Sequence, residues 1–474
     1  MRITAVIAVV AAVLVAAAGC RERRPPPAPR PSPRPGNGLN VLLVTIDTLR
    51  ADHLGLYAYT RNTSPRIDAL ARQGAVFDRA YTYWPKTRGS MAIMLTGRRP
   101  SQNGYSKAHP MLLDFNPTLA SVLKEAGYAT TAAVDNPNVA AANGYAKGFD
   151  TYRETWEEKA LATEADRARA ITDTAISFLL GAGTDRPFFL WLHYVNPHAP
   201  YSPPAPYDSA FLDEASREGP RLRTVPGLHG GIPRQWVVPG RDRLGYYVAQ
   251  YDGEIAAVDE QVGRVMDALQ RSRAASRTVV VLTSDHGESL GEHDYYFDHG
   301  EDVFEPSLAI PLLVIAPGLA PGIRVDAFAS TLDIVPTILD AVKVSYPPDL
   351  AGTSLLPVAR GESGGPDRLF AQNDRNLSAT WDRRLKLVAT PVGDGRRLAL
   401  YDRVKDPGET KDLSRARPED LRPQRRELEQ HLERTDRDWA ATRRLTEGAA
   451  GEPKMSAEAC EKLKALGYVQ QCAP

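Results

Sequence analysis

The stretch Val279–Gly300, VVVLTSDHGESLGEHDYYFDHG, joins an apolar run to an acidic residue and a histidine. Val279–Thr283 is wholly β-branched or apolar, which predicts a buried strand of a parallel sheet. Asp285 and His286 follow this strand. Ligands of open α/β sheets bind beyond the carboxyl ends of strands, and a carboxylate beside an imidazole suits a divalent cation. The stretch therefore predicts an α/β fold with a metal site, near which His299 offers another imidazole.

Predicted strands and helices alternate between residues 40 and 342. This alternation is typical of an α/β fold with a largely parallel sheet flanked by helices. The predicted strands are 41–46, 128–135, 186–195, 279–283 and 310–316. The predicted helices are 63–74, 116–127, 163–180, 246–270 and 331–342. Residues 203–241, rich in proline, glycine and charge, predict a long surface insertion that shapes access of the substrate.

The pattern changes after residue 343. Short strands at 369–373, 385–389 and 397–401 predict a small antiparallel subdomain, and a charged helix is expected within 418–446. The domain boundaries that we predict are a catalytic domain at 39–343, a C-terminal subdomain at 344–446 and a tail at 447–474.

The N-terminus has the pattern of an export signal. Arg2 precedes an apolar run over residues 3–18, which is too short for a typical membrane span of about 20 residues. Residues 1–20 end in Ala-Ala-Gly-Cys, which resembles a bacterial lipobox with Cys20 as the lipidated residue. An ordinary cleaved signal and an uncleaved anchor are the alternatives, and all three export the chain. The proline-rich residues 21–38 predict an extended linker.

Charge and cysteine content narrow the classes of partner. The chain has 58 basic and 58 acidic residues, and this balance argues against a nucleic-acid partner. A lipid on Cys20 would attach the protein to a membrane of the cell envelope. Cys460 and Cys472 are either a disulfide, which an exported compartment permits, or two free thiols.

Two further strand ends carry polar residues. Asp47 follows the strand 41–46, where it is either a metal ligand or the cap of a turn. His198 lies in a proline-rich loop after the strand 186–195, at a position suited to binding a substrate. His193, inside that strand, is interpreted as a packing residue.

A segment with two hydroxyl groups leads into a helix predicted at 92–97. Thr87 and Ser90 are the candidate nucleophiles, because a helix N-terminus favours anionic ligands. Lys86 and Arg88 are candidate anion-binding residues. The plainer interpretation is a serine N-cap among solvated charges.

Ten pieces of the sequence together resemble the sulfatase family of the alkaline-phosphatase superfamily. They occur in the same order as in that family, from about residue 40 to 413. The matching pieces are NVLLVTIDTLRADHLGLYAY, MLTGRRP, LKEAGYAT, KGFDTY, PFFLWLHYVNPHAPY, YDGEIAAVDEQVGRVMDAL, VLTSDHGESLGEH, IPLLVIAPG, STLDIVPTIL and LYDRVKDPGETKDL. The resemblance implies an α/β sandwich around a large mostly parallel sheet, with a small C-terminal antiparallel subdomain.

The resemblance also implies a metal-dependent ester hydrolase. The family's metal-ligand positions match Asp47, Asp285 and His286. The family uses calcium or magnesium, whereas an imidazole ligand such as His286 suits zinc or manganese, and a second metal is an open alternative.

Three more family positions match residues that would contact the substrate anion or the leaving group. His198 matches an imidazole of this kind. His299 stands where many sulfatases have a lysine that contacts sulfate. Lys107 lies near another anion-binding lysine of the family.

The chain departs from the family at the nucleophile. Sulfatases oxidise a cysteine or serine to formylglycine, but the aligned segment here is Thr87–Met91, and threonine cannot form that group. Proline is replaced by Gly89 and arginine by Met91, and the second of two paired aspartates is Thr48. A threonine nucleophile resembles the phosphodiesterases and phosphotransferases of the superfamily. A shift in alignment of three residues would make Ser90 the nucleophile instead.

The sequence thus predicts an exported, metal-dependent hydrolase of sulfate or phosphate esters, with Thr87 as nucleophile. Its substrate would be a small-molecule, glycan or lipid ester. Two alternatives remain: a phosphoester transferase or phosphodiesterase that uses Thr87, and a catalytically silent sulfatase-like binding protein.

Overall fold

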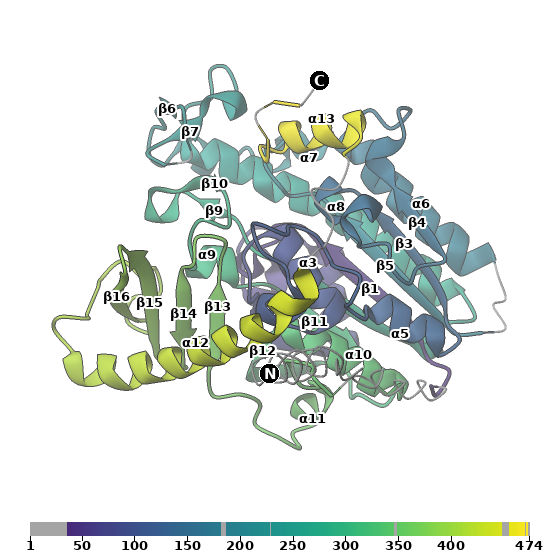
Figure 1. Cartoon of the computed structure of the whole chain (residues 1–474). Helices are drawn as coiled ribbons and strands as arrows, with labels where there is room; N and C mark the ends of the chain where they lie inside the picture. The colour runs from purple at the N-terminus through teal and green to yellow at the C-terminus, as the bar shows by residue number, and fades with distance from the viewer. Residues whose placement is uncertain are drawn as a thin grey trace, which may run out of the picture. The chain divides into compact units, whose positions relative to one another are not determined.

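An eight-stranded sheet forms the centre of the fold (Figure 1). The computed structural model describes residues 36–181, 186–227, 229–345, 348–447, 455–469 and 471–472. The strand order is β12-β2-β11-β8-β1-β5-β3-β4. The strands are β1 (Asn40–Ile46), β2 (Ala75–Tyr81), β3 (Ala129–Val134), β4 (Thr151–Glu154), β5 (Phe188–Tyr194), β8 (Thr278–Ser284), β11 (Leu312–Ile315) and β12 (Ile323–Ser330). Neighbouring strands are parallel except at β11, which runs antiparallel to β8 and β2.

Helices cover both faces of this sheet, because its central strands are apolar on both sides. In β1, Val41 and Leu43 belong to one buried cluster, and Leu42 and Val44 belong to the other. On the first face lie α3 (Thr87–Thr96), α5 (Leu119–Glu125) and α10 (Ile334–Val342). On the second face lie α2 (Pro65–Leu70), α6 (Glu164–Gly181) and α8 (Leu244–Arg271). The result is a sandwich of helices around one sheet.

A second, antiparallel sheet follows along the chain. Its strands, in order, are β13 (Leu369–Gln372), β14 (Ser378–Trp381), β15 (Leu385–Val392) and β16 (Gly395–Asp402). The long helix α12 (Pro418–Thr446) packs on this sheet through Leu428 (Figure 1). Trp381 joins Tyr81 and Phe328 of the large sheet in one apolar cluster, so the two sheets share a buried interface.

The remaining elements are short. The helices are α4 (Pro100–Asn103), α7 (Tyr207–Ala210), α9 (Glu305–Leu308), α11 (Leu356–Ala359) and α13 (Ala457–Ala465). The strands β6 (Thr224–Val225) and β7 (Ile232–Pro233) form one pair, and β9 (Ser289–Leu290) and β10 (Tyr296–Asp298) form another. The predicted insertion 203–241 contains only such short pieces.

The structure confirms the predicted α/β class, with a large mostly parallel sheet and a small antiparallel one. The sequence analysis missed β2, β4, β12 and β14. β2 and β12 carry charged residues that interrupt their apolar runs, and β4 and β14 have only four residues each. The helix expected from residue 92 begins at Thr87, because the amide of Ser90 already bonds the carbonyl of Lys86 at 2.9 Å.

The ends of the chain are only partly described. The predicted signal at 1–20, Cys20 and the linker up to residue 35 lie outside the described residues. Within the described part, none of the helices combines the length and apolarity that crossing a membrane requires. Cys460 and Cys472 form a disulfide, which decides between the two alternatives left open for them.

Candidate active site

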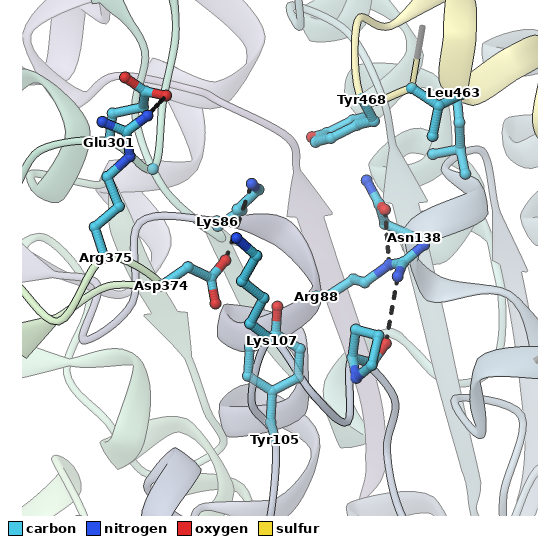
Figure 2. Close-up of a pocket in the computed structure, with 13 residues that line it drawn as sticks. Lys86, Arg88, Tyr105, Lys107, Asn138, Glu301, Asp374, Arg375, Leu463 and Tyr468 are labelled. Carbon is cyan, nitrogen blue, oxygen red and sulfur yellow. Dashed lines mark hydrogen bonds and ion pairs between the residues drawn. The ribbon is translucent and has the colours of Figure 1, made fainter. Parts of the chain in front are cut away.

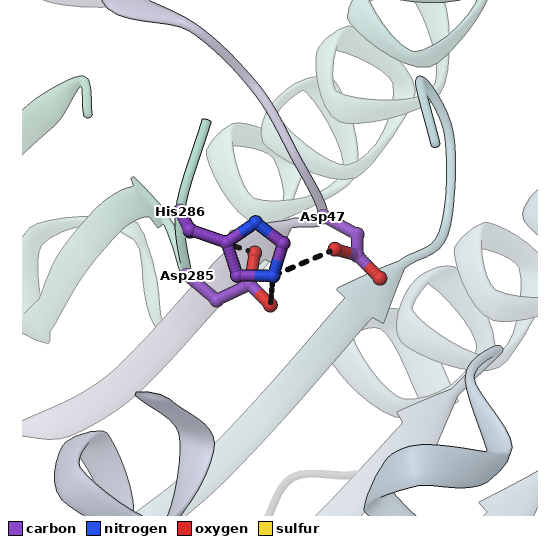
Figure 3. A group of neighbouring side chains, drawn as sticks. All are labelled: Asp47, Asp285 and His286. Carbon is purple, nitrogen blue, oxygen red and sulfur yellow. Dashed lines mark hydrogen bonds and ion pairs between the residues drawn. The ribbon is translucent and has the colours of Figure 1, made fainter. Parts of the chain in front are cut away.

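The carboxyl ends of two adjacent parallel strands bring two aspartates together. β1 and β8 pair in register, with Ile46 opposite Ser284. Asp47 and Asp285 are the next residues on each strand, so both carboxylates emerge at the same edge of the sheet, and His286 follows (Figure 3). All three side chains are fully buried. The sequence pattern at these strand ends therefore corresponds to one cluster in space.

Three atoms with free lone pairs, one from each side chain of this cluster, lie close together. The Nδ1 of His286 lies 3.0 Å from the carbonyl oxygen of Gly287, so Nδ1 carries the proton and Nε2 keeps its lone pair. This Nε2 lies 3.2 Å from Oδ2 of Asp285 and 3.7 Å from Oδ1 of Asp47 (Figure 3). Neither carboxylate oxygen has a hydrogen-bond partner. Buried acceptors in such an arrangement are unfavourable unless a cation lies between them.

The electrostatics of the cluster lead to the same conclusion. Burial and the neighbouring charge of Asp285 raise the pKa of Asp47 well above its ordinary value, and burial raises the pKa of Asp285 as well. Burial lowers the pKa of His286 to about 3, so its imidazole is neutral at physiological pH. Two carboxylates and a neutral imidazole within 4.8 Å of one another fit a divalent cation. The residues that would hold it are Asp47, Asp285 and His286.

The backbone beside Asp47 is strained. Thr48, a β-branched residue, has a φ of 54° in the left-handed region, where such residues are rare and strain of about 1–3 kcal/mol is typical. In this conformation the amide of Thr48 donates to Oδ1 of Asp285 at 3.3 Å, and its carbonyl accepts from the hydroxyl of Tyr251 at 2.7 Å. The strained turn thereby connects the two aspartates.

Thr87 occupies the first position of α3 and faces the candidate metal site. Its Oγ1 lies 3.2 Å from Nε2 of His286, and the helix N-terminus at this point favours negative charge. Gly89 permits the close approach of Trp84, since a Cβ at residue 89 would lie 2.3 Å from the Trp84 ring. This contact accounts for glycine at the position where the family has proline.

The other candidate nucleophile turns away from the cluster. The Oγ of Ser90 donates to the main-chain oxygen of Asp285 at 2.7 Å and lies 3.1 Å from Oγ1 of Thr82. Its hydroxyl is thus engaged in holding the strand end. The geometry places Thr87, and not Ser90, at the candidate metal site.

Two histidines from distant segments complete this side of the site. His198 and His299 are buried, and their rings lie 5.1 Å apart. The Nδ1 of His198 contacts the carbonyl oxygen of Ala199 at 2.5 Å, and Nδ1 of His299 contacts Glu288 at 3.3 Å. In both rings Nε2 is therefore the atom directed to the site.

The predicted anion-binding residues line an adjacent cavity. Lys86, Arg88 and Lys107 contribute to a cavity of about 360 Å³ (Figure 2). Lys86 lies 3.9 Å from Asp374, whereas Arg88 donates to the side chain of Asn138 at 2.9 Å. Arg375 and the acidic Glu301 and Asp374 also line the cavity, so its basic side chains outnumber its acidic ones.

The structure adds residues that the sequence analysis missed. Asn136, just beyond β3, donates to Oδ2 of Asp47 at 2.5 Å, and the strand-end rule applied to β3 could have found it. His193, interpreted as a packing residue, is fully buried, and its Nε2 lies 3.9 Å from the same carboxylate oxygen, too far for a hydrogen bond. Tyr468, near the C-terminus, places its hydroxyl 3.0 Å from Oγ1 of Thr87. No local pattern around Tyr468 signals this position.

Comparison with known families identifies the family to which the chain belongs. The sulfatase family model matches residues 39–344, and a second model, the C-terminal region of N-sulphoglucosamine sulphohydrolase, matches residues 291–438. The chain belongs to the sulfatase family. It is accordingly a hydrolase of the class that acts on sulfate and phosphate esters.

Sulfatases of other organisms align along most of the chain. A Δ4,5-hexuronate-2-O-sulfatase of Bacteroides thetaiotaomicron is 24% identical over 418 residues, covering 79% of this chain and 84% of that protein. An arylsulfatase of Clostridium perfringens is 26% identical over 380 residues, covering 67% and 77%. The phosphonate monoester hydrolase of Agrobacterium radiobacter has a similar fold, with a TM-score of 0.69, 22% identity and coverage of 84% and 96%. The two sulfatases support the ester-hydrolase class, and the phosphonate monoester hydrolase supports the fold.

Proposed function

We propose that the protein is a metal-dependent hydrolase of phosphate, phosphonate or sulfate esters in which Thr87 is the nucleophile. The observation that carries the proposal is the position of Oγ1 of Thr87, 3.2 Å from Nε2 of His286. In this position the hydroxyl lies beside three acceptor atoms suited to a divalent cation. Such a cation supplies Lewis acidity and lowers the pKa of a nearby hydroxyl.

The residues of the chain suggest how the reaction proceeds. Oγ1 of Thr87 attacks the phosphorus or sulfur of the ester while its proton passes to Nε2 of His198, and the bond to the alcohol leaving group breaks as the leaving oxygen takes up that proton. The N-terminus of α3 stabilises the anionic group. Water then attacks the threonine ester, which releases phosphate, phosphonate or sulfate and restores the hydroxyl. Buried His198 is directed to the site through Nε2 and is the candidate for contact with the leaving group.

The residue at the nucleophile position favours phosphorus over sulfur. A formylglycine hydrate has a second hydroxyl that expels sulfate, and Thr87 has a single one. Release of the group from Thr87 therefore depends on attack at phosphorus or sulfur by water or by an acceptor alcohol. The relatives from Bacteroides thetaiotaomicron and Clostridium perfringens are sulfatases, so both classes of ester belong in the test.

The direct test is turnover of a panel of aryl esters. The panel consists of 4-nitrophenyl phosphate, bis(4-nitrophenyl) phosphate, 4-nitrophenyl phenylphosphonate and 4-nitrophenyl sulfate. The protein is stripped with a chelator and reloaded separately with zinc, manganese, magnesium or calcium. We expect turnover only after reloading, together with a phosphoryl, phosphonyl or sulfuryl adduct on the peptide that contains Thr87 in rapidly quenched samples.

Two controls define the outcome. Thr87→Ala should abolish both the adduct and turnover, while the control Tyr57→Phe, whose hydroxyl contacts only the main chain of Phe77 and Leu312, should retain both. An adduct that passes to added alcohol rather than to water identifies a transferase. If the metal-loaded wild type gives neither adduct nor turnover with any ester of the panel, the assignment as a hydrolase is rejected and a binding protein is favoured.

We also propose that the chain is exported and attached to a membrane through a lipid on Cys20. The support is the sequence alone: the apolar run at 3–18 and the lipobox-like ending before Cys20. Expression in a bacterium with labelled palmitate tests it. Wild type should carry the label in the membrane fraction and Cys20→Ser should not; an unlabelled wild type rejects lipidation.

A further inference from the structure

The C-terminal segment, residues 456–472, returns to the active site. It begins after both family models have ended, at residues 344 and 438. Its helix α13 leads to Tyr468, whose hydroxyl reaches the nucleophile. Tyr468 lies 381 positions after Thr87 in the chain, so only the fold brings them together.

The hydroxyl of Tyr468 contacts three residues of the candidate site. It lies 3.0 Å from Oγ1 of Thr87, 2.9 Å from Nε2 of His198 and 3.1 Å from Nε2 of His299. No other residue in the described part of the chain hydrogen-bonds all three of these side chains. The phenol is thus at the centre of the proposed reaction site.

The phenol of Tyr468 has one hydrogen, so donors and acceptors match in two of its three contacts, and one imidazole Nε2 faces the phenol oxygen without a hydrogen between them. Both imidazoles use Nδ1 for a carbonyl or carboxylate oxygen, so their Nε2 atoms accept hydrogen bonds. The phenol of Tyr468 donates its single hydrogen to one of them. Its oxygen then accepts the hydrogen of the Thr87 hydroxyl, which fixes the direction of the lone pairs on Oγ1.

The segment that carries Tyr468 is anchored in the body of the protein. Leu463 and Leu466 are buried, and the ammonium of Lys462 pairs with Glu164 and lies 4.0 Å from Asp135. The disulfide between residues 460 and 472 encloses the tyrosine within a short loop. Buried apolar side chains, a half-buried ion pair and a crosslink therefore hold the backbone of this segment beside the site.

The ring of Tyr468 also faces the place where substrate would enter. It lines the basic cavity together with Leu463, opposite Lys86 and Lys107 (Figure 2). Thr87 is fully buried in the structure. An ester in the cavity therefore meets Tyr468 before it reaches Oγ1 of Thr87.

We propose that Tyr468 is a catalytic residue, delivered by the C-terminal segment, whose hydroxyl aligns Thr87 and hydrogen-bonds the reacting ester group. When an ester enters, the phenol side chain turns aside by a small rotation. Because its backbone is anchored, the hydroxyl stays within reach of the transferred group and donates to one of its oxygens. This proposal rests on the proposed function for the identity of the reacting group.

The test is Tyr468→Phe, which keeps the ring and removes only the hydroxyl. We expect kcat/KM on the best ester of the panel to fall about 10- to 100-fold, the range for a lost hydrogen bond to a charged group. Metal content and melting temperature should remain close to wild type. Tyr57→Phe, which removes a buried hydroxyl away from the site, should leave kcat/KM unchanged.

A second measurement does not require turnover. Binding of inorganic phosphate and of sulfate to the metal-loaded protein is measured by calorimetry, and Tyr468→Phe should weaken the binding of at least one anion. If no ester is turned over but this weakening is seen, the proposed activity fails while the assignment of Tyr468 stands.

Several results would overturn the assignment. Unchanged or higher kcat/KM in Tyr468→Phe, or equal or tighter anion binding, would show that the phenol only occupies the site and blocks access to Thr87. A wild type that neither turns over an ester nor binds either anion rejects both proposals.

Discussion

Removal of the Thr87 hydroxyl should reduce activity, whereas removal of the Ser90 hydroxyl should reduce stability. Thr87→Ala removes the oxygen that lies 3.2 Å from Nε2 of His286, and loss of a nucleophile reduces kcat by a factor on the order of 10³ to 10⁶. Thr87→Ser keeps the oxygen and loses one methyl group, so its kcat should remain within about tenfold of wild type. The free energy of unfolding should change little in Thr87→Ser.

Ser90→Ala should act on stability instead. It removes a buried donor to the carbonyl of Asp285 at 2.7 Å and a contact with Thr82 at 3.1 Å. A buried acceptor left without its partner costs about 1–3 kcal/mol, which would appear as a lower midpoint in urea. Even if the whole of this cost fell on the transition state, the rate would drop only about 5- to 150-fold.

The assay combines single-turnover kinetics with urea unfolding for all three variants. Single-turnover rates report the chemical step, and the unfolding midpoint reports folding. If Ser90→Ala lost all activity with a normal midpoint while Thr87→Ala remained active, the assignment of Thr87 would be refuted. The sequence alignment would then be shifted by three residues.

Three further predictions concern the metal, the crosslink and a buried ion pair. The two carboxylates of the candidate metal site have raised pKa values, so metal affinity should rise from pH 5 to 8 with proton release, measured by calorimetry in two buffers; a pH-independent affinity contradicts this. In the metal-free protein the same raised pKa values make the protonated carboxyls contribute to the free energy of unfolding. This contribution is fully present below about pH 4 and is lost as the pH rises through the folded-state pKa values. Reducing Cys460–Cys472 removes a crosslink worth about 3 kcal/mol and should expose the tail to proteases before the body unfolds; equal resistance of the reduced tail argues against a crosslinked segment. Lys386 lies 2.7 Å from Glu409 with both side chains buried. Lys386→Met leaves the carboxylate unpaired and should lower the free energy of unfolding, measured in urea, by about 3–5 kcal/mol. The double variant Lys386→Met with Glu409→Gln should recover part of this loss.

The class of the fold could be predicted because its signals are local. The apolar runs of β1, β5 and β8 are continuous, as expected of strands covered on both faces, and the polar residues that follow them stand directly at the strand ends. The charged β2 and the short β4 lack such signals, and their place in the sheet depends on pairing with strands elsewhere in the chain.

The candidate site could be predicted from the sequence in part. The placement of Asp47 and Asp285 follows from the parallel register of β1 and β8, which any parallel pairing of those strands would produce. The start of α3 was predicted five residues too late, because Gly89 argues against a helix interior and only the fold shows that Trp84 packs against this glycine.

The sequence by itself determined the α/β architecture, the residues at the strand ends and the chemistry that those residues can perform. The tertiary structure decided which hydroxyl faces the candidate metal cluster, because the direction of a side chain in a first helical turn depends on what the helix packs against. It also decided the place of Tyr468, whose contacts with Thr87 and two histidines join segments hundreds of residues apart. Hydrophobic periodicity and strand ends are encoded within about ten residues of chain, whereas contacts of this kind arise only when the whole chain has folded.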